Sequence, residues 1–292
     1  MRAYLKLLRP HHWTKNGFCL AGLAFGGHLR DPEAWTLALA CLGVFCAGAS
    51  AIYIINDILD LEHDRQHPRK KNRPLASGAV GIPAALVIAL ILAGGAGYGA
   101  WLLGPRVLAC LCGYLVNNLA YSVVLKHRPI VDVLSIAVGF CLRILAGVYV
   151  LGELPTTWIV LCTFFLATFL GTAKRRAEMG RAATDENAVQ RPVLANYSVQ
   201  FLEYMLNSCA IMALVCYALF TTSSGRNPSL VVTVPFVFYA IMHYKRIVVV
   251  LDEGEEPETI LLKDWRLQLA ILLWGGAFFA VEFFKPEWFK VP

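Results

Sequence analysis

Charged residues are scarce in this sequence and are missing from long parts of it. Only 16% of the 292 residues are Asp, Glu, Lys or Arg, whereas soluble domains carry about 25%. An uncharged stretch of about 20 residues is typical of a transmembrane helix, because that length crosses a hydrocarbon core of roughly 30 Å. The stretches of this kind are 34–56, 74–105, 107–125, 154–173, 204–225 and 227–244. The composition therefore excludes an ordinary soluble domain.

Metal-binding cysteine pairs and a signal peptide are also missing. None of the nine cysteines forms a C-x-x-C pair, and all lie in or beside apolar stretches. Free cysteine commonly packs as a small buried hydrophobe, so we expect no disulfides and no cysteine-bound metal. The basic segment Met1–Arg9 is not followed by a small-residue cleavage site, which argues against a signal peptide. With no low-complexity segment and no soluble second domain, one domain is expected over 1–292.

Three further apolar segments complete the expected fold. They are 16–29, 130–151, which Arg143 interrupts, and 267–284. Together with the six uncharged stretches they predict an all-α, polytopic membrane protein with nine transmembrane helices.

The positions of lysine and arginine predict the orientation. Of the 26 Lys and Arg residues, most lie in the N-terminus and in the loops after the second, fourth, sixth and eighth spans. Because cytoplasmic loops are enriched in Lys and Arg, we expect the N-terminus and the polar loops 57–82 and 174–200 to be cytoplasmic. The net charge of +6 follows from this asymmetry and requires no nucleic-acid partner. A bacterial inner membrane is the expected location.

The most polar stretch, "NDILDLEHDRQHPRKKNRP", begins where the second span ends. If that helix continues past Ile55, the 100° step per residue places Asn56, Asp57, Asp60 and Asp64 within one arc of about 100°. Clustered carboxylates repel one another, and a divalent cation removes that repulsion. Oxygen ligands suit Mg²⁺. The other interpretation is an acidic helix end that pairs with its own arginines.

These residues resemble the first aspartate-rich motif of the UbiA superfamily of intramembrane prenyltransferases. The family pattern N-D-x-x-D-x-x-x-D, followed by K-x-x-R-P, matches this chain from Asn56 to Pro74. Further similar stretches are "RPHHWTKN" at 9–16, "YSVVLKHRPIVDVLSIAVGFCLRILAG" at 121–147, "GTAKRRAEM" at 171–179 and "RPVLANYS" at 191–198. The resemblance implies a bundle of nine helices around a cavity that opens to the cytoplasm. It also implies that Mg²⁺ bridges the motif to a diphosphate, with Asp57, Asp60 and Asp64 as catalytic residues and Asn56, Asp60 and Asp64 as metal ligands.

The second motif differs from that of relatives that prenylate aromatic rings. They carry a second acidic motif after the sixth span, where this chain reads "KRRAEMGRAATDENAVQRP". A basic site favours an anion that is held directly by guanidinium and ammonium groups. With the "RPHHWTKN" opening, it resembles the decaprenyl-phosphate phosphoribosyltransferase branch. That resemblance implies 5-phosphoribosyl diphosphate as donor and polyprenyl phosphate as acceptor.

We expect the following residues to bind the two substrates. Lys70 and Arg73 would hold the diphosphate, Lys15 and Asn16 would close the donor site, and Tyr121 and Lys126 would take the 5-phosphate or a ribose hydroxyl. The acceptor phosphate would lie at Lys174, Arg175 and Glu178, although the basic residues there could instead be topology anchors. Arg143 lies roughly 20 Å along the fifth span; it either binds substrate or ties helices together.

Two other functions remain open. The first is an aromatic prenyltransferase with a polyprenyl diphosphate donor, as in quinone biosynthesis, which the basic second motif disfavours. The second is a transporter or lipid-binding membrane protein; transporters place charges near mid-membrane, whereas the acids here gather at one rim. Membrane lipids are expected partners, and a homo-oligomer is possible.

Overall fold

The computed structural model describes residues 2–66, 70–184, 192–223, 225–252, 254 and 257–289. Its described elements are all helical, which confirms the all-α class. The chain divides into two compact units. Unit 1 comprises 1–126 and 138–155, and unit 2 comprises 127–137 and 156–292.

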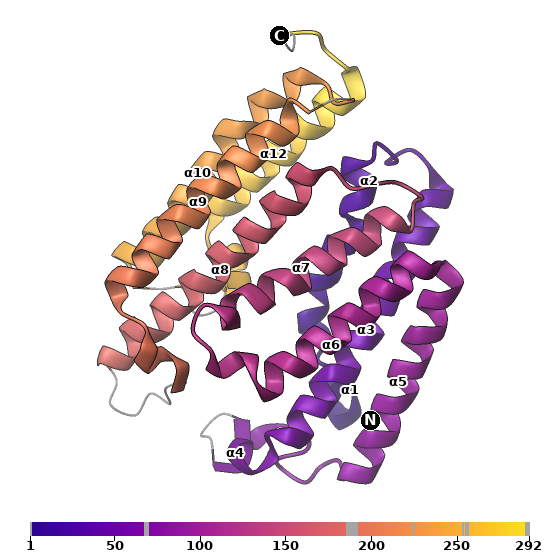
Figure 1. Cartoon of the computed structure of the whole chain (residues 1–292), viewed down its shortest axis with the longest axis vertical. Helices are drawn as coiled ribbons and strands as arrows, with labels where there is room; N and C mark the ends of the chain where they lie inside the picture. Colours follow the sequence, from indigo (N-terminus) through magenta and orange to yellow (C-terminus); the bar gives the residue numbers. More distant parts are fainter. Residues whose placement is uncertain are drawn as a thin grey trace. The chain divides into compact units, whose positions relative to one another are not determined.

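Unit 1 is built around a long helix that is flanked by two others (Figure 1). Helix α3 packs against α5, and α6 packs against both. Its elements are α1 (Arg2–Leu8), the 3₁₀ segment η1 (Pro10–Leu20), α2 (Ala21–Phe25), α3 (Pro32–Leu59), α4 (Leu61–Gln66), η2 (Lys70–Asn72), α5 (Ile82–Leu103), α6 (Pro105–Val123) and η3 (Leu125–His127). The later part of α7 (Val131–Tyr149) completes the unit.

Unit 2 contains the start of α7 and the helices that follow it. Helices α8 and α9 form its largest helix–helix contact, and α10 packs against α12. The elements are α8 (Thr157–Thr184), η4 (Pro192–Asn196), α9 (Val199–Thr221), η5 (Pro228–Thr233), α10 (Val234–Val250), α11 (Pro257–Lys263) and α12 (Trp265–Phe284).

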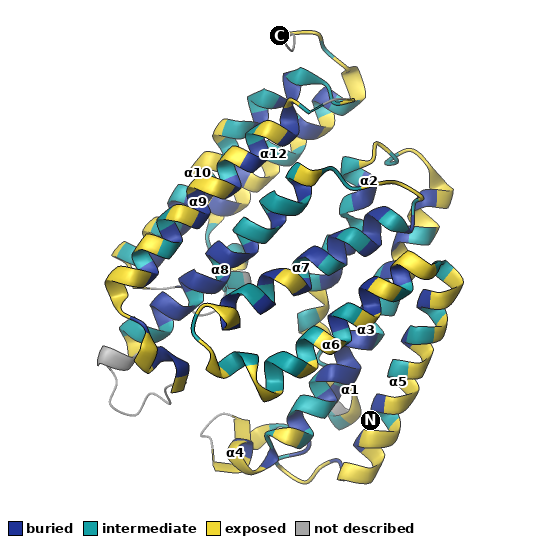
Figure 2. Ribbon diagram, in the orientation of Figure 1, coloured by how far each residue is buried: buried dark blue, intermediate teal, exposed yellow. Residues whose placement is uncertain are grey.

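Seven segments of the described chain are long and apolar enough to cross a membrane. They are Pro32–Leu59, Ile82–Leu103, Val131–Tyr149, Thr157–Arg181, Val199–Thr221, Pro228–Val250 and Trp265–Phe284. Large apolar side chains stay exposed along α5 and α12 (Figure 2), among them Leu90, Ile91 and Leu272. Exposed apolar surface of this extent fits contact with lipid rather than water. These helices make the chain an integral membrane protein.

The expectation of nine spanning helices is only partly confirmed. Helix α6 has 19 residues and lies at the expected fourth position, but Asn117, Asn118 and Ser122 make it more polar than the seven. The predicted span over 16–29 is not a regular α-helix. Residues 16–25 belong to the 3₁₀ segment η1 and to the five-residue helix α2, and residues 26–29 follow outside any helix. The cytoplasm-facing cavity stays a prediction.

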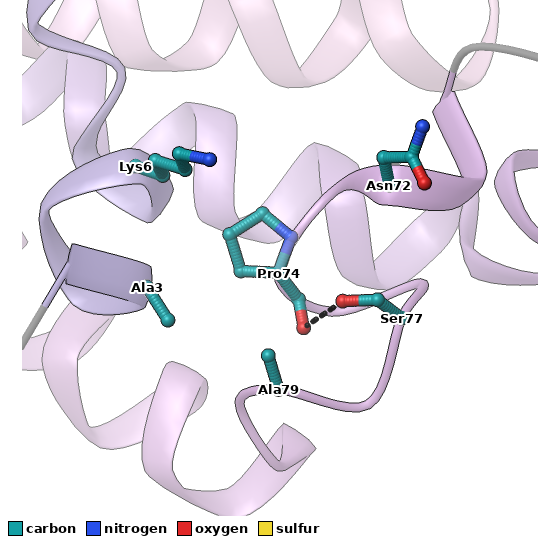
Figure 3. A pocket seen from close by; sticks show the side chains of 6 residues that line it. All are labelled: Ala3, Lys6, Asn72, Pro74, Ser77 and Ala79. Atoms are coloured by element: carbon teal, nitrogen blue, oxygen red, sulfur yellow. Dashed lines mark hydrogen bonds between the residues drawn. The ribbon is translucent and has the colours of Figure 1, made fainter.

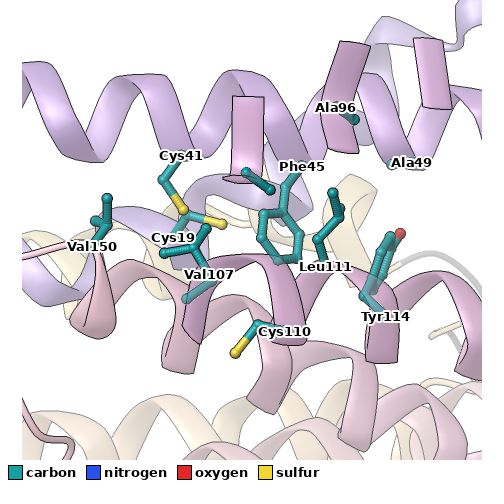
Figure 4. Close-up of a cluster of buried hydrophobic side chains, with 12 residues drawn as sticks. Cys19, Cys41, Phe45, Ala49, Ala96, Val107, Cys110, Leu111, Tyr114 and Val150 are labelled. Carbon is teal, nitrogen blue, oxygen red and sulfur yellow. The ribbon is translucent and has the colours of Figure 1, made fainter. Parts of the chain in front are cut away.

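The core of unit 1 consists largely of small side chains (Figure 4). Around Phe45 and Leu111 lie three cysteines and four alanines: Cys19, Cys41, Cys110, Ala49, Ala96, Ala100 and Ala146. All nine cysteines of the chain are free in the structure. Small residues let helix backbones approach closely, which is how packing replaces the hydrophobic driving force in a membrane.

The closest backbone approach in unit 1 joins η1 and α2 to α7. A Cβ atom built on Gly147 would lie 2.0 Å from the carbonyl oxygen of Cys19, and one on Gly22 would lie 2.2 Å from the carbonyl oxygen of Gly147. Glycine is therefore required at both positions, because backbone atoms cannot move aside as a flexible side chain can.

We predict that Gly147→Ala destabilises the protein by several kcal/mol, on the order of the cost of a strongly overpacked core. Gly113→Ala is the matched control, since its Cβ would meet only Leu142 at the ordinary distance of 3.5 Å. Thermal unfolding in detergent measures both variants. Equal melting temperatures for the two alanine variants would show that the backbone of α7 at Gly147 leaves room for a Cβ beside η1.

Candidate active site

The four predicted motif residues lie where α3 ends and α4 begins in unit 1; we call them the aspartate cluster (Asn56, Asp57, Asp60 and Asp64). Helix α3 continues past Ile55 to Leu59, as the motif predicted, and Asp60 is its C-terminal cap. The Asp60 N–H donates to the Asn56 carbonyl at 2.9 Å, and the Asp64 N–H donates to the Asp60 carbonyl at 2.9 Å. The helical path therefore continues through the cap, which keeps the cluster together.

Asp57 and Asp64 are buried and share one arginine. Arg73 Nη1 donates to Asp57 Oδ1 at 3.1 Å and to Asp64 Oδ2 at 2.5 Å. Arg9 also pairs with Asp57 Oδ1, and Lys70 Nζ lies 3.9 Å from Asp64 Oδ1. Two of the predicted substrate-binding residues, Lys70 and Arg73, thus already contact the cluster.

Asn56 and Asp60 face the end of α6 instead. Lys126 Nζ lies 3.2 Å from Asp60 Oδ1, and Ser122 Oγ lies 2.7 Å from Asn56 Oδ1. The side chain of Asp60 is 42% exposed, whereas that of Asp57 or Asp64 is only 3% exposed. Asp60 is thus the carboxylate that a ligand reaches most easily. Tyr121 lies one residue before Ser122 and is half-buried.

The hydroxyl of Ser122 bears on the orientation of the Asn56 amide. Ser122 Oγ is also 2.9 Å from the carbonyl oxygen of Asn118, but a serine hydroxyl carries a single proton. If that proton goes to Asn118, the Asn56 amide must turn its NH₂ toward Ser122 to form a bond. The Asn56 carbonyl oxygen is then free to face the carboxylates.

The cluster fits a divalent cation in its chemistry. Three carboxylates and an amide supply oxygen ligands only, which is what Mg²⁺ prefers. Among the described residues, however, no three Asp, Glu, His or Cys side chains already converge on one point. The cations of Arg9, Arg73 and Lys126 pair with these carboxylates and would have to give way. The metal roles of Asn56, Asp60 and Asp64 stay predictions.

Arg9 was not identified from the sequence, although it opens the "RPHHWTKN" stretch. Its backbone is left-handed, with φ 52°, a conformation that is uncommon for residues other than glycine. Its guanidinium lies 5.3 Å from the Tyr53 ring centroid. Burial lowers the pKa of Arg9, and the nearby charge of Asp57 opposes that shift. A strained, half-buried arginine on a motif carboxylate indicates a functional position.

The predicted residues Asn16 and Arg143 lie together inside unit 1. Arg143 donates from Nε to Asn16 Oδ1 at 2.7 Å, from Nη1 to the Gly139 carbonyl at 3.0 Å, and from Nη2 to Tyr114 Oη at 2.9 Å. The amide nitrogen of Asn16 bonds Cys46 Sγ at 3.3 Å. These contacts favour the interpretation that Arg143 ties η1, α6 and α7 together. Lys15 lies one residue before Asn16 and is half-buried.

Unit 2 holds a second charged group, which we call the arginine network (Asp132, Arg175, Glu178 and Tyr197). Arg175 Nε donates to Asp132 Oδ2 at 2.7 Å, and Arg175 Nη1 donates to Glu178 Oε2 at 2.8 Å. The side chains of Arg175 and Asp132 are 1% and 0% exposed. Arg175 is therefore neutralised inside the unit rather than presented to a ligand, which differs from the expectation of an open basic site.

Other residues of the predicted basic site are partly described. Arg176 pairs with Glu203 at 3.4 Å and with Asp252 at 3.0 Å. Lys174 is half-buried and Arg181 is exposed. Asp185, Glu186 and Arg191, the other charged residues quoted from this loop, lie outside the described residues.

Tyr197 and Asp132 were also missed by sequence reasoning, although both stand in the quoted family-like stretches. Tyr197 Oη donates to Asp132 Oδ1 at 2.7 Å and accepts from the Ile130 N–H at 2.5 Å. Burial, followed by the bond to Asp132, raises the pKa of Tyr197, so the hydroxyl keeps its proton. Ile130 has φ 69°, a real outlier for a β-branched residue. The network thus holds a strained turn at the start of α7.

We predict that Tyr197→Phe lowers the free energy of unfolding by about 1–3 kcal/mol, because the buried Asp132 and the Ile130 N–H each lose a partner. Tyr204→Phe is the matched control, since Tyr204 is exposed and bonds only Gln200 among the described residues. In an Ile130→Gly background the Tyr197→Phe loss should shrink, since glycine adopts this backbone without strain. Thermal unfolding measures the stability lost on Tyr197→Phe in each background. An equal loss in both would exclude a role for backbone strain at Ile130.

The fold is similar to solved structures of UbiA homologues. A UbiA homologue from Archaeoglobus fulgidus, bound to GPP and Mg²⁺, superimposes with a TM-score of 0.74 at 21% identity, covering 96% of this chain and 99% of that one. A digeranylgeranylglyceryl phosphate synthase superimposes with a TM-score of 0.68 at 17% identity, covering 96% of this chain and 98% of that one. At these identities the similarity shows the fold alone.

Sequence relatives are closer. The decaprenyl-phosphate phosphoribosyltransferase of Mycobacterium tuberculosis is 34% identical over 280 residues, covering 92% of this chain and 91% of the relative. The protein of that name from Mycolicibacterium smegmatis is 33% identical over 300 residues, covering 96% and 92%. The model of the UbiA prenyltransferase family matches residues 17–280. The chain therefore belongs to the UbiA prenyltransferase family.

Proposed function

We propose that the protein transfers a 5-phosphoribosyl group from phosphoribosyl diphosphate to a polyprenyl phosphate such as decaprenyl phosphate, and releases diphosphate. The observation that carries this proposal is the 33–34% identity, over more than nine-tenths of the chain, to relatives named decaprenyl-phosphate phosphoribosyltransferase. The product would be a precursor of cell-wall arabinan.

The aspartate cluster is the proposed donor site. The carboxylates of Asp57, Asp60 and Asp64 and the amide of Asn56 would hold Mg²⁺, which neutralises charge on the leaving diphosphate when bound. The Asn56 oxygen accepts a hydrogen bond from Ser122, so the amide would have to turn over or give up that bond to hold the metal. The nucleophile would be an oxygen of the lipid phosphate, which attacks C1 of the ribose as the bond from C1 to diphosphate breaks. The aspartate cluster therefore needs to supply no nucleophile.

The cations that surround the cluster have a second proposed task. Arg9 and Arg73 contact Asp57, and Lys126 contacts Asp60. When the carboxylates turn to a metal ion, these cations become available for the oxygens of the donor. Guanidinium groups bind phosphate oxygens in a forked geometry. The site would thus exchange internal ion pairs for ligand contacts without leaving a charge unpaired. Lys15 and Tyr121 stay candidates for the donor, without a contact that assigns their role.

The acceptor phosphate is proposed to meet Lys174 rather than Arg175. The guanidinium of Arg175 is held between Asp132 and Glu178, and separating it from them would leave buried charges unpaired, at a cost of several kcal/mol. Arg175 and Glu178 would therefore support the acceptor site without binding the phosphate. We further infer that both polar loops and the active site are cytoplasmic, on the distribution of Lys and Arg.

The direct test uses the purified protein with phosphoribosyl diphosphate, polyprenyl phosphate and Mg²⁺, with the lipid product followed by mass spectrometry. A parallel reaction offers polyprenyl diphosphate and an aromatic acceptor, the reaction of ring-prenylating relatives. A phosphoribosylated lipid in the first reaction supports the proposal. A prenylated ring in the second reaction, with no product in the first, would assign the other activity.

We predict that Asp60→Ala lowers turnover by 100-fold or more, since losing a metal ligand commonly costs several kcal/mol of transition-state stabilisation. We expect Mg²⁺ to raise the melting temperature of the wild type, and Asp60→Ala should abolish that rise. Glu62→Ala is the matched control, because Glu62 is exposed and pairs only with Arg65 among the described residues. A normal response of Asp60→Ala to Mg²⁺ would remove Asp60 from the metal site.

We predict that Lys174→Glu raises the KM for polyprenyl phosphate by about tenfold, because a charge-assisted bond contributes about 1.5–3 kcal/mol. The KM for phosphoribosyl diphosphate should change little, since its diphosphate would bind in the aspartate cluster. The matched control is Lys245→Glu, which reverses the charge of a half-buried lysine on α10. Parallel increases in both KM values would contradict separate donor and acceptor sites.

A further inference from the structure

A hollow of about 250 Å³ lies on unit 1, between α1 and the segment 72–79 that includes Arg73. It is lined by Ala3, Lys6, Asn72, Pro74, Ser77 and Ala79. Figure 3 shows Lys6 and Asn72 at opposite rims with the Pro74 ring between them. Nothing in the donor or acceptor chemistry described above uses these side chains.

The polar groups of the hollow suit an oxyanion. The Lys6 ammonium is exposed and forms no hydrogen bond or ion pair with any described residue. The hydroxyl of Ser77 reaches the Pro74 carbonyl only at 3.4 Å, a weak bond that a better acceptor would replace. The Asn72 amide lies at the opposite rim (Figure 3). No acidic side chain lines the hollow, so Lys6 is the charged residue of its lining.

Apolar surface on both sides of the hollow indicates where its ligand comes from. On α1, Tyr4 and Leu5 beside Lys6 are exposed. On the other side the membrane-spanning helix α5 starts three residues after Ala79, and its Ile82 and Leu86 are exposed. The hollow thus lies at the end of a membrane span, at the depth of lipid headgroups. Lysine near a membrane surface attracts anionic lipid, with its apolar stem along the acyl boundary.

We propose that this hollow binds the phosphate group of an anionic phospholipid, whose acyl chains lie along the exposed face of α5. None of the residues proposed for the donor or the acceptor lines the hollow. Its lining residues Asn72 and Pro74 flank Arg73, whose guanidinium contacts Asp57 and Asp64.

A group of buried apolar side chains connects the hollow to the helix that carries the aspartate cluster. Leu7 of α1, Ile54 of α3, and Leu75 and Val80 of the segment before α5 belong to one buried group. A lipid phosphate that holds Lys6 to Asn72 and Ser77 therefore steadies the segment that places Arg73. Anionic lipid should stabilise the folded protein through this site, since a ligand that binds only the native state raises its stability.

The test uses the full-length protein in phosphatidylcholine nanodiscs with increasing shares of phosphatidylglycerol. The readouts are the lipid-dependent rise in melting temperature and the phosphatidylglycerol retained in native mass spectrometry. The variant is Lys6→Ala on α1, and the matched control is Lys71→Ala, an exposed lysine of η2 that does not line the hollow. We expect Lys6→Ala to need about fivefold more phosphatidylglycerol for the same effect, which corresponds to roughly 1 kcal/mol per cation. Lys71→Ala should respond as the wild type does.

Two results would overturn the proposal. The first is an unchanged response of Lys6→Ala, or an equal loss in Lys71→Ala, which would reveal diffuse surface attraction instead of a site. The second comes from inorganic phosphate added to pure phosphatidylcholine nanodiscs: stabilisation equal to that by phosphatidylglycerol would assign the hollow to free phosphate. If Lys6→Ala does not fold, Ser77→Ala takes its place with the same expected direction, and an unchanged response of that variant overturns the proposal equally.

Discussion

The contact of Arg73 with both Asp57 and Asp64 is the constraint on which unit 1 depends. Two carboxylates buried at the end of a membrane span repel each other and lose hydration. The Arg73 guanidinium between them offsets both the repulsion and the lost hydration. This requires the segment after α4 to return to the end of α3. The turn at Asp60, the short helix α4 and the buried Leu75 and Val80 serve that return. The fold of this region is thus set by charge neutralisation as much as by apolar packing.

The two units neutralise charge in different ways, and the difference bears on function. Around the aspartate cluster the four cations come from three separate places in the sequence, and Asp60 stays partly exposed. Such pairs can rearrange when a ligand brings its own charge. In the arginine network, Arg175 and Asp132 are almost wholly buried and Tyr197 completes their bonds. Rearrangement there would leave a buried charge unpaired, which favours a supporting role for the network over direct substrate binding.

Close packing of small residues determines how near the helices of unit 1 approach. The contact between the backbones at Gly22 and Gly147 brings η1 against α7, and that approach allows Arg143 to reach Asn16. The buried guanidinium of Arg143 donates hydrogen bonds to neutral acceptors. It also lies over the rings of Tyr114 and Phe140, which adds cation–π attraction. The segment before Gly22 is therefore shaped by its neighbour, which explains why it departs from a regular transmembrane helix.

Sequence alone determined the features that depend on local periodicity. Stretches without charge located the spanning helices, and the helical spacing of Asn56, Asp57, Asp60 and Asp64 predicted their common position, because neighbours on a helix are neighbours in sequence. Only the tertiary structure decided their partners. Arg9 lies 48 residues before Asp57, Ser122 lies 66 residues after Asn56, and Tyr197 lies 65 residues after Asp132. It also decided that Arg175 is enclosed by carboxylates, since no local pattern shows which acid folds back onto a given arginine.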